Sequence, residues 1–164
     1  MKLGYVTLQG RGRTDALIAQ ATELLAAEGL RLCGTVQTNT TRPGRAKCDM
    51  DLRILPDGPV IRISEDRGDL ARGCRLDSGA LEQTVQQVEQ RLDGADLLIV
   101  NKFGKRETEG RGLSALIAEA LDRGIPVLVG VNALNLPAFQ EFSGGLAQAL
   151  PPDPAGIVHW FKAH

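Results

Sequence analysis

The sequence has few aromatic residues, few cysteines and no long hydrophobic run. Phe, Trp and Tyr make up 4% of the 164 residues, whereas hydrophobic residues of all kinds make up 43%. Leu, Val, Ile and Ala must therefore fill the core, and the length is typical of a single domain over residues 1–164. No apolar stretch is long enough to cross a bilayer, so we expect no membrane insertion.

The cysteines and the charge exclude further classes of protein. Cys33, Cys48 and Cys74 are odd in number and form no C-x-x-C pair, which argues against a disulfide framework or a metal site. The first apolar run is short and soon broken by Arg11 and Arg13, so it does not fit a secretory signal. These features predict a cytoplasmic protein. The net charge of −1 argues against general nucleic-acid binding.

Strand-like and helix-like segments alternate along the chain. Strands are expected at 2–8, 30–37, 50–55, 60–64, 96–100, 125–131 and 156–160, and helices at 15–28, 78–92, 112–123 and 135–142. This alternation predicts a three-layer α/β fold, with a mostly parallel sheet and helices on both faces. Pro56-Asp57-Gly58 predicts an inserted β-hairpin. The polar segments 38–47, 65–77 and 101–111 are expected to be loops.

The loops expected at the carboxyl ends of the strands carry an excess of positive charge. Segments 9–14, 38–47, 65–77 and 101–111 together contain twelve Lys and Arg residues against six Asp and Glu residues. Ligands of open α/β sheets bind at this edge, and a positive local field attracts anions. We therefore expect a small anionic ligand there, while solvation of ordinary charged loops is the alternative explanation.

The first segment of the chain has the layout of a phosphate-binding loop. An apolar run leads into Gly10-Arg11-Gly12-Arg13-Thr14, and a helical pattern follows. Glycines there allow close approach of the backbone to an anion, and a helix N-terminus directs N–H groups at it. The pattern departs from G-x-x-x-x-G-K-[ST], because Thr7 replaces the first glycine and Arg13 the lysine.

Two interpretations of this loop stay open. Arg13 could grip an oxyanion through its guanidinium group, with the backbone at Gly10 and Gly12 and the hydroxyl of Thr14 beside it. Alternatively the segment is an ordinary turn, with Thr14 as the cap of the helix. Asp15, just inside the helix, is unfavourable for a nearby phosphate because the two charges repel.

The segment 96–102 is similar to the strand that orders magnesium in P-loop nucleoside-triphosphatases. That strand normally ends in a carboxylate, but here it ends in Asn101-Lys102. This difference argues against efficient magnesium-dependent hydrolysis. The nearest acidic residues along the chain are Glu107 and Glu109, which could be linked to a metal but which we expect to be merely exposed. Asn101, Lys102 and Lys105 could instead hold an oxyanion directly.

Two further segments carry weaker signals. Cys74 and Arg75 lie just before a helix N-terminus, where a cysteine can become a thiolate. A half-buried cysteine, with Arg75 paired to an aspartate, is the alternative. Asp49 and Asp51 share one face of a strand, where they could chelate a metal or simply face solvent.

The segment 96–113, with its Asn-Lys-Phe-Gly-Lys stretch, resembles a bacterial family of unknown function. Gly73-Cys-Arg-Leu-Asp77 and Val129-Gly-Val-Asn132 carry the same resemblance, which covers nearly the full chain. That family tends to be encoded near molybdate-transport genes and is related in outline to P-loop nucleoside-triphosphatases. The resemblance implies a RecA-like or similar three-layer α/β fold and a link to the handling of molybdate or of molybdenum cofactor. It implies no established reaction and no catalytic residue.

Together these observations predict a cytoplasmic, P-loop-like protein that binds a nucleotide or a small oxyanion. The predicted ligand-binding residues are Gly10, Gly12, Arg13, Thr14, Asn101, Lys102 and Lys105, with Arg75 as a further arm. Any hydrolysis would be that of a slow nucleoside-triphosphatase. The alternative is a non-catalytic regulatory or adaptor protein on the same scaffold. An oligomer is compatible with either function.

Overall fold

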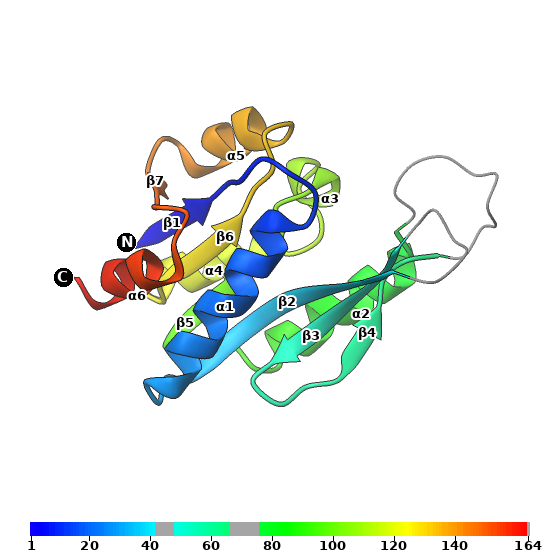
Figure 1. Ribbon diagram of the computed structural model, residues 1–164, viewed down its shortest axis with the longest axis horizontal. Coiled ribbons are helices and arrows are strands. Elements are labelled where there is room, and N and C mark those ends of the chain that lie inside the picture. Colours follow the sequence, from blue (N-terminus) through cyan, green and yellow to red (C-terminus); the bar gives the residue numbers. More distant parts are fainter. Residues whose placement is uncertain (42–47, 66–75, 164) are drawn as a thin grey trace.

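The computed structural model describes residues 1–41, 48–65 and 76–163 (Figure 1). Its strands are β1 (Leu3–Val6), β2 (Leu32–Thr41), β3 (Cys48–Leu55), β4 (Val60–Arg62), β5 (Leu97–Val100), β6 (Val127–Gly130) and β7 (Gln148–Ala149). Its helices are α1 (Arg13–Ala27), α2 (Ser78–Glu89), α3 (Lys105–Thr108), α4 (Ser114–Asp122), α5 (Leu136–Ser143) and α6 (Pro154–Lys162).

The strands of these ranges form one mixed sheet in the order β4-β3-β2-β5-β6-β1-β7. Strands β2, β5, β6, β1 and β7 run parallel to one another. Strands β3 and β4 pair in the antiparallel sense and extend the sheet beyond β2. The mostly parallel sheet and the added hairpin are therefore confirmed. Because the parallel strands point the same way, the segments that follow β1, β2, β5 and β6 meet at one edge.

Helices cover both faces of the sheet and create two cores. One core joins α1 to α6 and includes Ile18, Leu25 and Ile157. The other lies under α2, α4 and α5 and includes Val88 and Ile117. Figure 1 shows α1 and α6 in front of the sheet, with α2 and α4 behind it. The predicted three layers are confirmed, and they explain the apolar sequences of β5 and β6, which are buried throughout.

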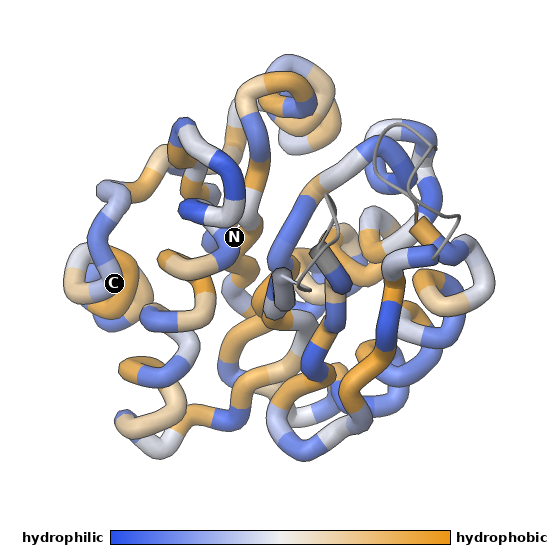
Figure 2. Tube along the Cα trace, turned by 45° about the vertical axis from the view of Figure 1, so that its right-hand side comes forward, coloured by the Kyte–Doolittle hydropathy of each residue, from blue (hydrophilic) through white to orange (hydrophobic). Residues whose placement is uncertain are grey.

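Several helices are hydrophobic on one side. Figure 2 shows that hydrophobic and hydrophilic residues alternate along several helices, at the spacing of the helical turn. No helix in the described ranges combines the length and the apolar character that crossing a bilayer requires.

The strand expected at 156–160 is instead helix α6. Asp153 caps this helix by accepting the Ala155 N–H at 3.2 Å, and Pro154 occupies its first turn. Ile157 and Trp160 are both buried, and their spacing of three residues suits a helix that packs against α1. The apolar run was too short to distinguish the two structures, and the cap and the proline were the missed signals.

The first residues of the loop expected at 38–47 belong instead to a strand. Strand β2 continues through Thr41 and pairs with β3, so that Asn39 lies opposite Met50. Threonines at 38, 40 and 41 suit an exposed strand, because β-branched side chains favour extended backbone. Residues 42–47 and 66–75 lie outside the described ranges. Two short elements were not expected: α3, inside the loop predicted at 101–111, and β7.

The close approach of β2 and β5 depends on Gly34. Its φ is +119°, and a Cβ placed there would lie 1.8 Å from the carbonyl oxygen of Ile99. We predict that Gly34→Ala lowers the free energy of unfolding by about 3–5 kcal/mol, from the steric clash together with the left-handed backbone. Thermal unfolding would show a melting temperature about 10 °C lower.

Gly124→Ala is the matched control for this prediction. Gly124 also has a positive φ, +78°, but no atom lies within 4 Å of the position that a Cβ would take. Gly124→Ala should lower the free energy of unfolding only by the backbone strain, about 1–2 kcal/mol. If the two variants lose the same free energy of unfolding, the clash with Ile99 does not contribute to the effect of Gly34→Ala.

Candidate anion-binding site

The segment between β1 and α1 forms a glycine turn at the carboxyl edge of the sheet. Gly10 and Gly12 have φ values of 104° and 76°, in the region that only glycine adopts easily. The Arg13 N–H reaches the Gly10 carbonyl at 3.4 Å, and Gly12 is the N-cap of α1. No side chain caps this helix, so its first N–H groups face the carboxyl edge without a side-chain acceptor.

The helix begins at Arg13, two residues earlier than predicted, and Thr14 does not cap it. The hydroxyl of Thr14 instead accepts the N–H of Leu8 at 3.1 Å, which ties the first turn of α1 to the start of the loop. Arg13 donates one N–H to the carbonyl of Gln9 at 3.1 Å. Its exposed guanidinium group keeps further donors for a ligand.

Asn101 is buried at the end of β5, with 2% of its surface exposed. Its side-chain oxygen accepts the Gln37 N–H at 2.9 Å, and its backbone N–H donates to the Thr35 hydroxyl at 3.2 Å. Its side-chain nitrogen donates to Asp15 Oδ1 at 2.7 Å. Asn101 therefore joins three elements, because Thr35 and Gln37 belong to β2 and Asp15 belongs to α1.

Asp15 is held by two neutral amides. Asn39 donates to its second oxygen, Oδ2, at 2.7 Å, and Gln37 Nε2 in turn donates to Asn39 Oδ1 at 2.9 Å. Within the described ranges, no lysine or arginine forms an ion pair with this carboxylate. We call Asp15, Gln37, Asn39 and Asn101 the Asp15 network. It was not predicted from the sequence.

Glu107 was expected to be exposed, but it is half-buried and fastens its own loop. Its carboxylate accepts the N–H of Gly104 at 2.8 Å and the N–H of Leu113 at 3.1 Å. Gly112 is required beside it, since a Cβ there would lie 1.7 Å from Glu107 Oε2. Burial raises the pKa of Glu107, while the two backbone N–H groups and the nearby Lys102 oppose this rise. Glu109 is exposed, as predicted.

The structure brings together only some of the predicted ligand-binding residues. The loop at 10–14 and Asn101 meet through Asp15. Lys102 and Lys105 are exposed on the segment that follows β5, and no hydrogen bond or ion pair in the described part of the chain links them to that loop. Arg75 and Cys74 lie outside the described residues.

A hollow between α1, β2 and β3 lies away from this edge. It is lined by Thr22, Glu23, Ala26, Leu30, Leu32, Arg53, Leu55 and Pro56. It follows the C-terminal half of α1, at the opposite end of the helix from the glycine turn.

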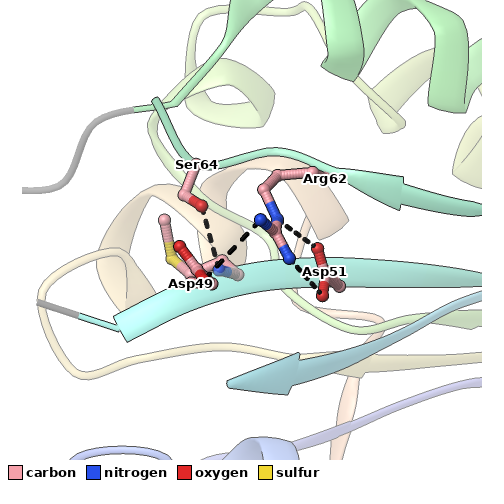
Figure 3. A network of polar contacts seen from close by, with 5 residues as sticks. Asp49, Asp51, Arg62 and Ser64 are labelled. Carbon is pink, nitrogen blue, oxygen red and sulfur yellow. Dashed lines mark hydrogen bonds and ion pairs between the residues drawn. The ribbon is translucent and has the colours of Figure 1, made fainter. Parts of the chain in front are cut away.

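Asp49 and Asp51 share one strand face, as predicted, but they face a cation. Arg62 of β4 donates to Asp51 Oδ1 at 2.9 Å and lies 3.6 Å from Asp49 Oδ2 (Figure 3). Ser64 lies beside them and accepts the Met50 N–H at 3.0 Å. These contacts fasten β4 to β3. Among the described residues, no three His, Cys, Asp or Glu side chains gather closely enough to hold a metal ion.

The chain belongs to the family described as protein of unknown function DUF2478, whose profile matches residues 3–160. It is also 32% identical over 149 residues to the molybdenum import ATP-binding protein ModC 2 of Bradyrhizobium diazoefficiens. That similarity covers 90% of this chain but only 17% of the relative, so the chain spans about a sixth of its length.

A solved structure has the same fold. The chain resembles a human cancer-related nucleoside triphosphatase with a TM-score of 0.59, and the match covers 91% of this chain and 87% of the human protein. The two sequences are 19% identical, so this likeness concerns the fold alone. It confirms the predicted P-loop-like α/β architecture.

The buried position of Glu107 predicts a pH-dependent contribution to stability. Because its pKa is raised above the ordinary value of 4.5, the folded chain holds this proton more tightly than the unfolded chain does. The contribution is therefore complete below pH 4.5 and declines as the pH rises through the folded pKa. The melting temperature of the natural chain, minus that of Glu107→Gln, should therefore fall as the pH rises above 4.5.

Glu109→Gln is the control, since that side chain is exposed on the same loop. Its melting temperature should follow that of the natural chain across the same range of pH. If the natural chain instead gains stability over Glu107→Gln as the pH rises, the assigned direction of the pKa shift is wrong.

Proposed function

We propose that this chain is a cytoplasmic protein that binds a nucleotide or a small oxyanion at the carboxyl edge of its sheet. One observation carries the proposal: the left-handed turn at Gly10 and Gly12 leads into a helix without a side-chain cap at the edge where α/β sheets bind ligands. An anion there would accept hydrogen bonds from the backbone of residues 10–14 and would meet the positive end of α1.

Exposed cations around this edge support an anionic ligand. Arg11 lies on the glycine turn, Arg13 begins α1, and Lys102 and Lys105 lie on the segment after β5. Arg13 is the expected bidentate contact, because its guanidinium matches the geometry of a phosphate or a similar oxyanion. Arg75, outside the described residues, is proposed as a further arm.

The curated relative supports the choice of ligand. Its name describes an ATP-binding protein of molybdenum import, and the alignment covers 90% of this chain. ATP is therefore the first nucleotide to test, and molybdate is the first oxyanion. By the same argument we propose that this chain takes part in handling molybdate.

Turnover, if present, would be slow. The loop has Arg13 where the motif has lysine, and β5 ends in Asn101 rather than a carboxylate. Positive charge from arginine and lysine would supply part of the stabilisation of the transition state.

A non-catalytic regulator or adaptor is the second candidate. The Thr14 hydroxyl is bonded to Leu8, and the polar atoms of the Asn101 side chain are bonded to Gln37 and Asp15. Both side chains are thereby engaged in bonds within the protein. These contacts favour a scaffold that binds without hydrolysis.

A thermal-shift panel tests the binding function. ATP, GTP, phosphate, sulfate and molybdate would each be added with and without Mg²⁺. A ligand at about 100 times its dissociation constant stabilises the folded state by about 2.7 kcal/mol, which raises the melting temperature by about 5–10 °C. We expect at least one ligand to do so, and Arg13→Ala to reduce the shift.

Arg31→Ala is the matched control, because Arg31 is exposed just before β2, at the opposite edge of the sheet. Arg31→Ala should leave the ligand-induced rise in melting temperature unchanged. If no ligand raises the melting temperature of the natural chain, the proposed binding function is wrong. Release of phosphate from ATP or GTP then separates the two candidates: turnover that is lost in Arg13→Ala favours the enzyme, and binding without turnover favours the regulator.

A further inference from the structure

The carboxylate that β5 lacks is present on the neighbouring helix. In P-loop nucleoside-triphosphatases the helix of the loop carries a hydroxyl and a strand carries the acid, and together they hold Mg²⁺. Here the end of β5 carries the amide of Asn101, and the first turn of α1 carries the acid of Asp15. The two side chains are in direct contact, at 2.7 Å. The acid therefore lies on the helix, and the strand carries a neutral partner for it.

The contact explains why an amide occupies position 101. The Gln37 N–H donates to Asn101 Oδ1, which leaves Asn101 Nδ2 to face Asp15. An aspartate at this position would turn a carboxylate oxygen toward the carboxylate of Asp15 at hydrogen-bond distance. Two carboxylates cannot both stay ionised at that separation without strong repulsion. One carboxylate at this junction therefore excludes a second.

Asp15 keeps both charge and bonding capacity. Each oxygen accepts one amide N–H, and a carboxylate has about four lone-pair positions, so about two remain. Its partners, Asn39 and Asn101, are neutral, and among the described residues no lysine or arginine forms an ion pair with it. A bare anion at the glycine turn would be repelled by this charge, whereas an anion that arrives with a cation would be attracted.

We propose that Asp15 sets the charge selectivity of the site, so that the site takes a nucleotide as its complex with a divalent cation and disfavours a bare oxyanion. Asp15 thereby replaces the strand carboxylate, and Asn101 positions it. This inference rests on the proposed binding function. It commits the site to one class of ligand among those that the glycine turn and the surrounding cations would accept.

Asp15→Asn is the direct test, because it removes the charge and keeps the shape. Calorimetric titrations would use ATP with excess Mg²⁺ and ATP with EDTA. We expect the variant to bind ATP with Mg²⁺ about tenfold more weakly, and ATP in EDTA a few-fold more tightly, than the natural chain does. A merely structural role for Asp15 would weaken both equally. Asp122→Asn, at the end of α4, is the control and should change neither.

The double variant Asp15→Asn with Asn101→Asp returns the acid to the strand and keeps the amide–carboxylate contact. It should regain the preference for ATP with Mg²⁺, whereas Asn101→Asp alone should lower the melting temperature because two carboxylates then meet. If the double variant regains the preference for ATP with Mg²⁺, the result supports the exchange of the acid and amide roles between positions 15 and 101. If a folded double variant does not regain this preference, the result contradicts the exchange.

The outcomes separate this inference from the proposed function. If the natural chain binds ATP equally well with Mg²⁺ and with EDTA, the charge selectivity is wrong and the binding function stands. If Asp15→Asn changes both affinities in the same direction, the selectivity is also wrong. If the natural chain binds neither form, both proposals fail together.

Discussion

The contact between Asp15 and Asn101 fixes the position of the loop after β1 relative to the end of β5. Asn101 is buried, and a buried polar group left without a partner costs about 1–3 kcal/mol. Its bonds to Gln37, Thr35 and Asp15 therefore restrict α1, β2 and β5 to one arrangement. The glycine turn, which has little side-chain packing of its own, takes its position from this network.

The rest of the edge is built by close approach of backbones. Gly130 leaves room for the backbone carbonyl of Asn101, since a Cβ on residue 130 would lie 2.2 Å from that oxygen. The Phe103 N–H in turn donates to the Gly130 carbonyl at 2.8 Å. Glu107 then closes the segment 104–113, which carries Lys105. Lys105 is thus presented by a segment that is fastened at both ends, whereas the carboxylate of Asp15 comes from helix α1.

Much of the fold could be predicted from the sequence, whereas the centre of the site could not. The apolar runs of β5 and β6 indicate buried strands, and Pro56-Asp57-Gly58 indicates the hairpin turn. The Asp15–Asn101 contact joins residues 86 positions apart, so no local pattern reveals it. Topology alone could have suggested it, because both residues follow parallel strands toward one edge. The half-burial of Glu107 likewise depends on a turn that brings Gly104 and Leu113 together.

The most direct measurement is a ¹H–¹⁵N nuclear magnetic resonance titration of the labelled chain with ATP and Mg²⁺. Binding at the glycine turn predicts that the largest shift changes fall on the backbone amides of residues 10–14 and on the side-chain amide of Asn101, which reports on Asp15. Changes centred on the hollow between α1, β2 and β3, or no changes at all, would contradict a ligand site at the Asp15 network.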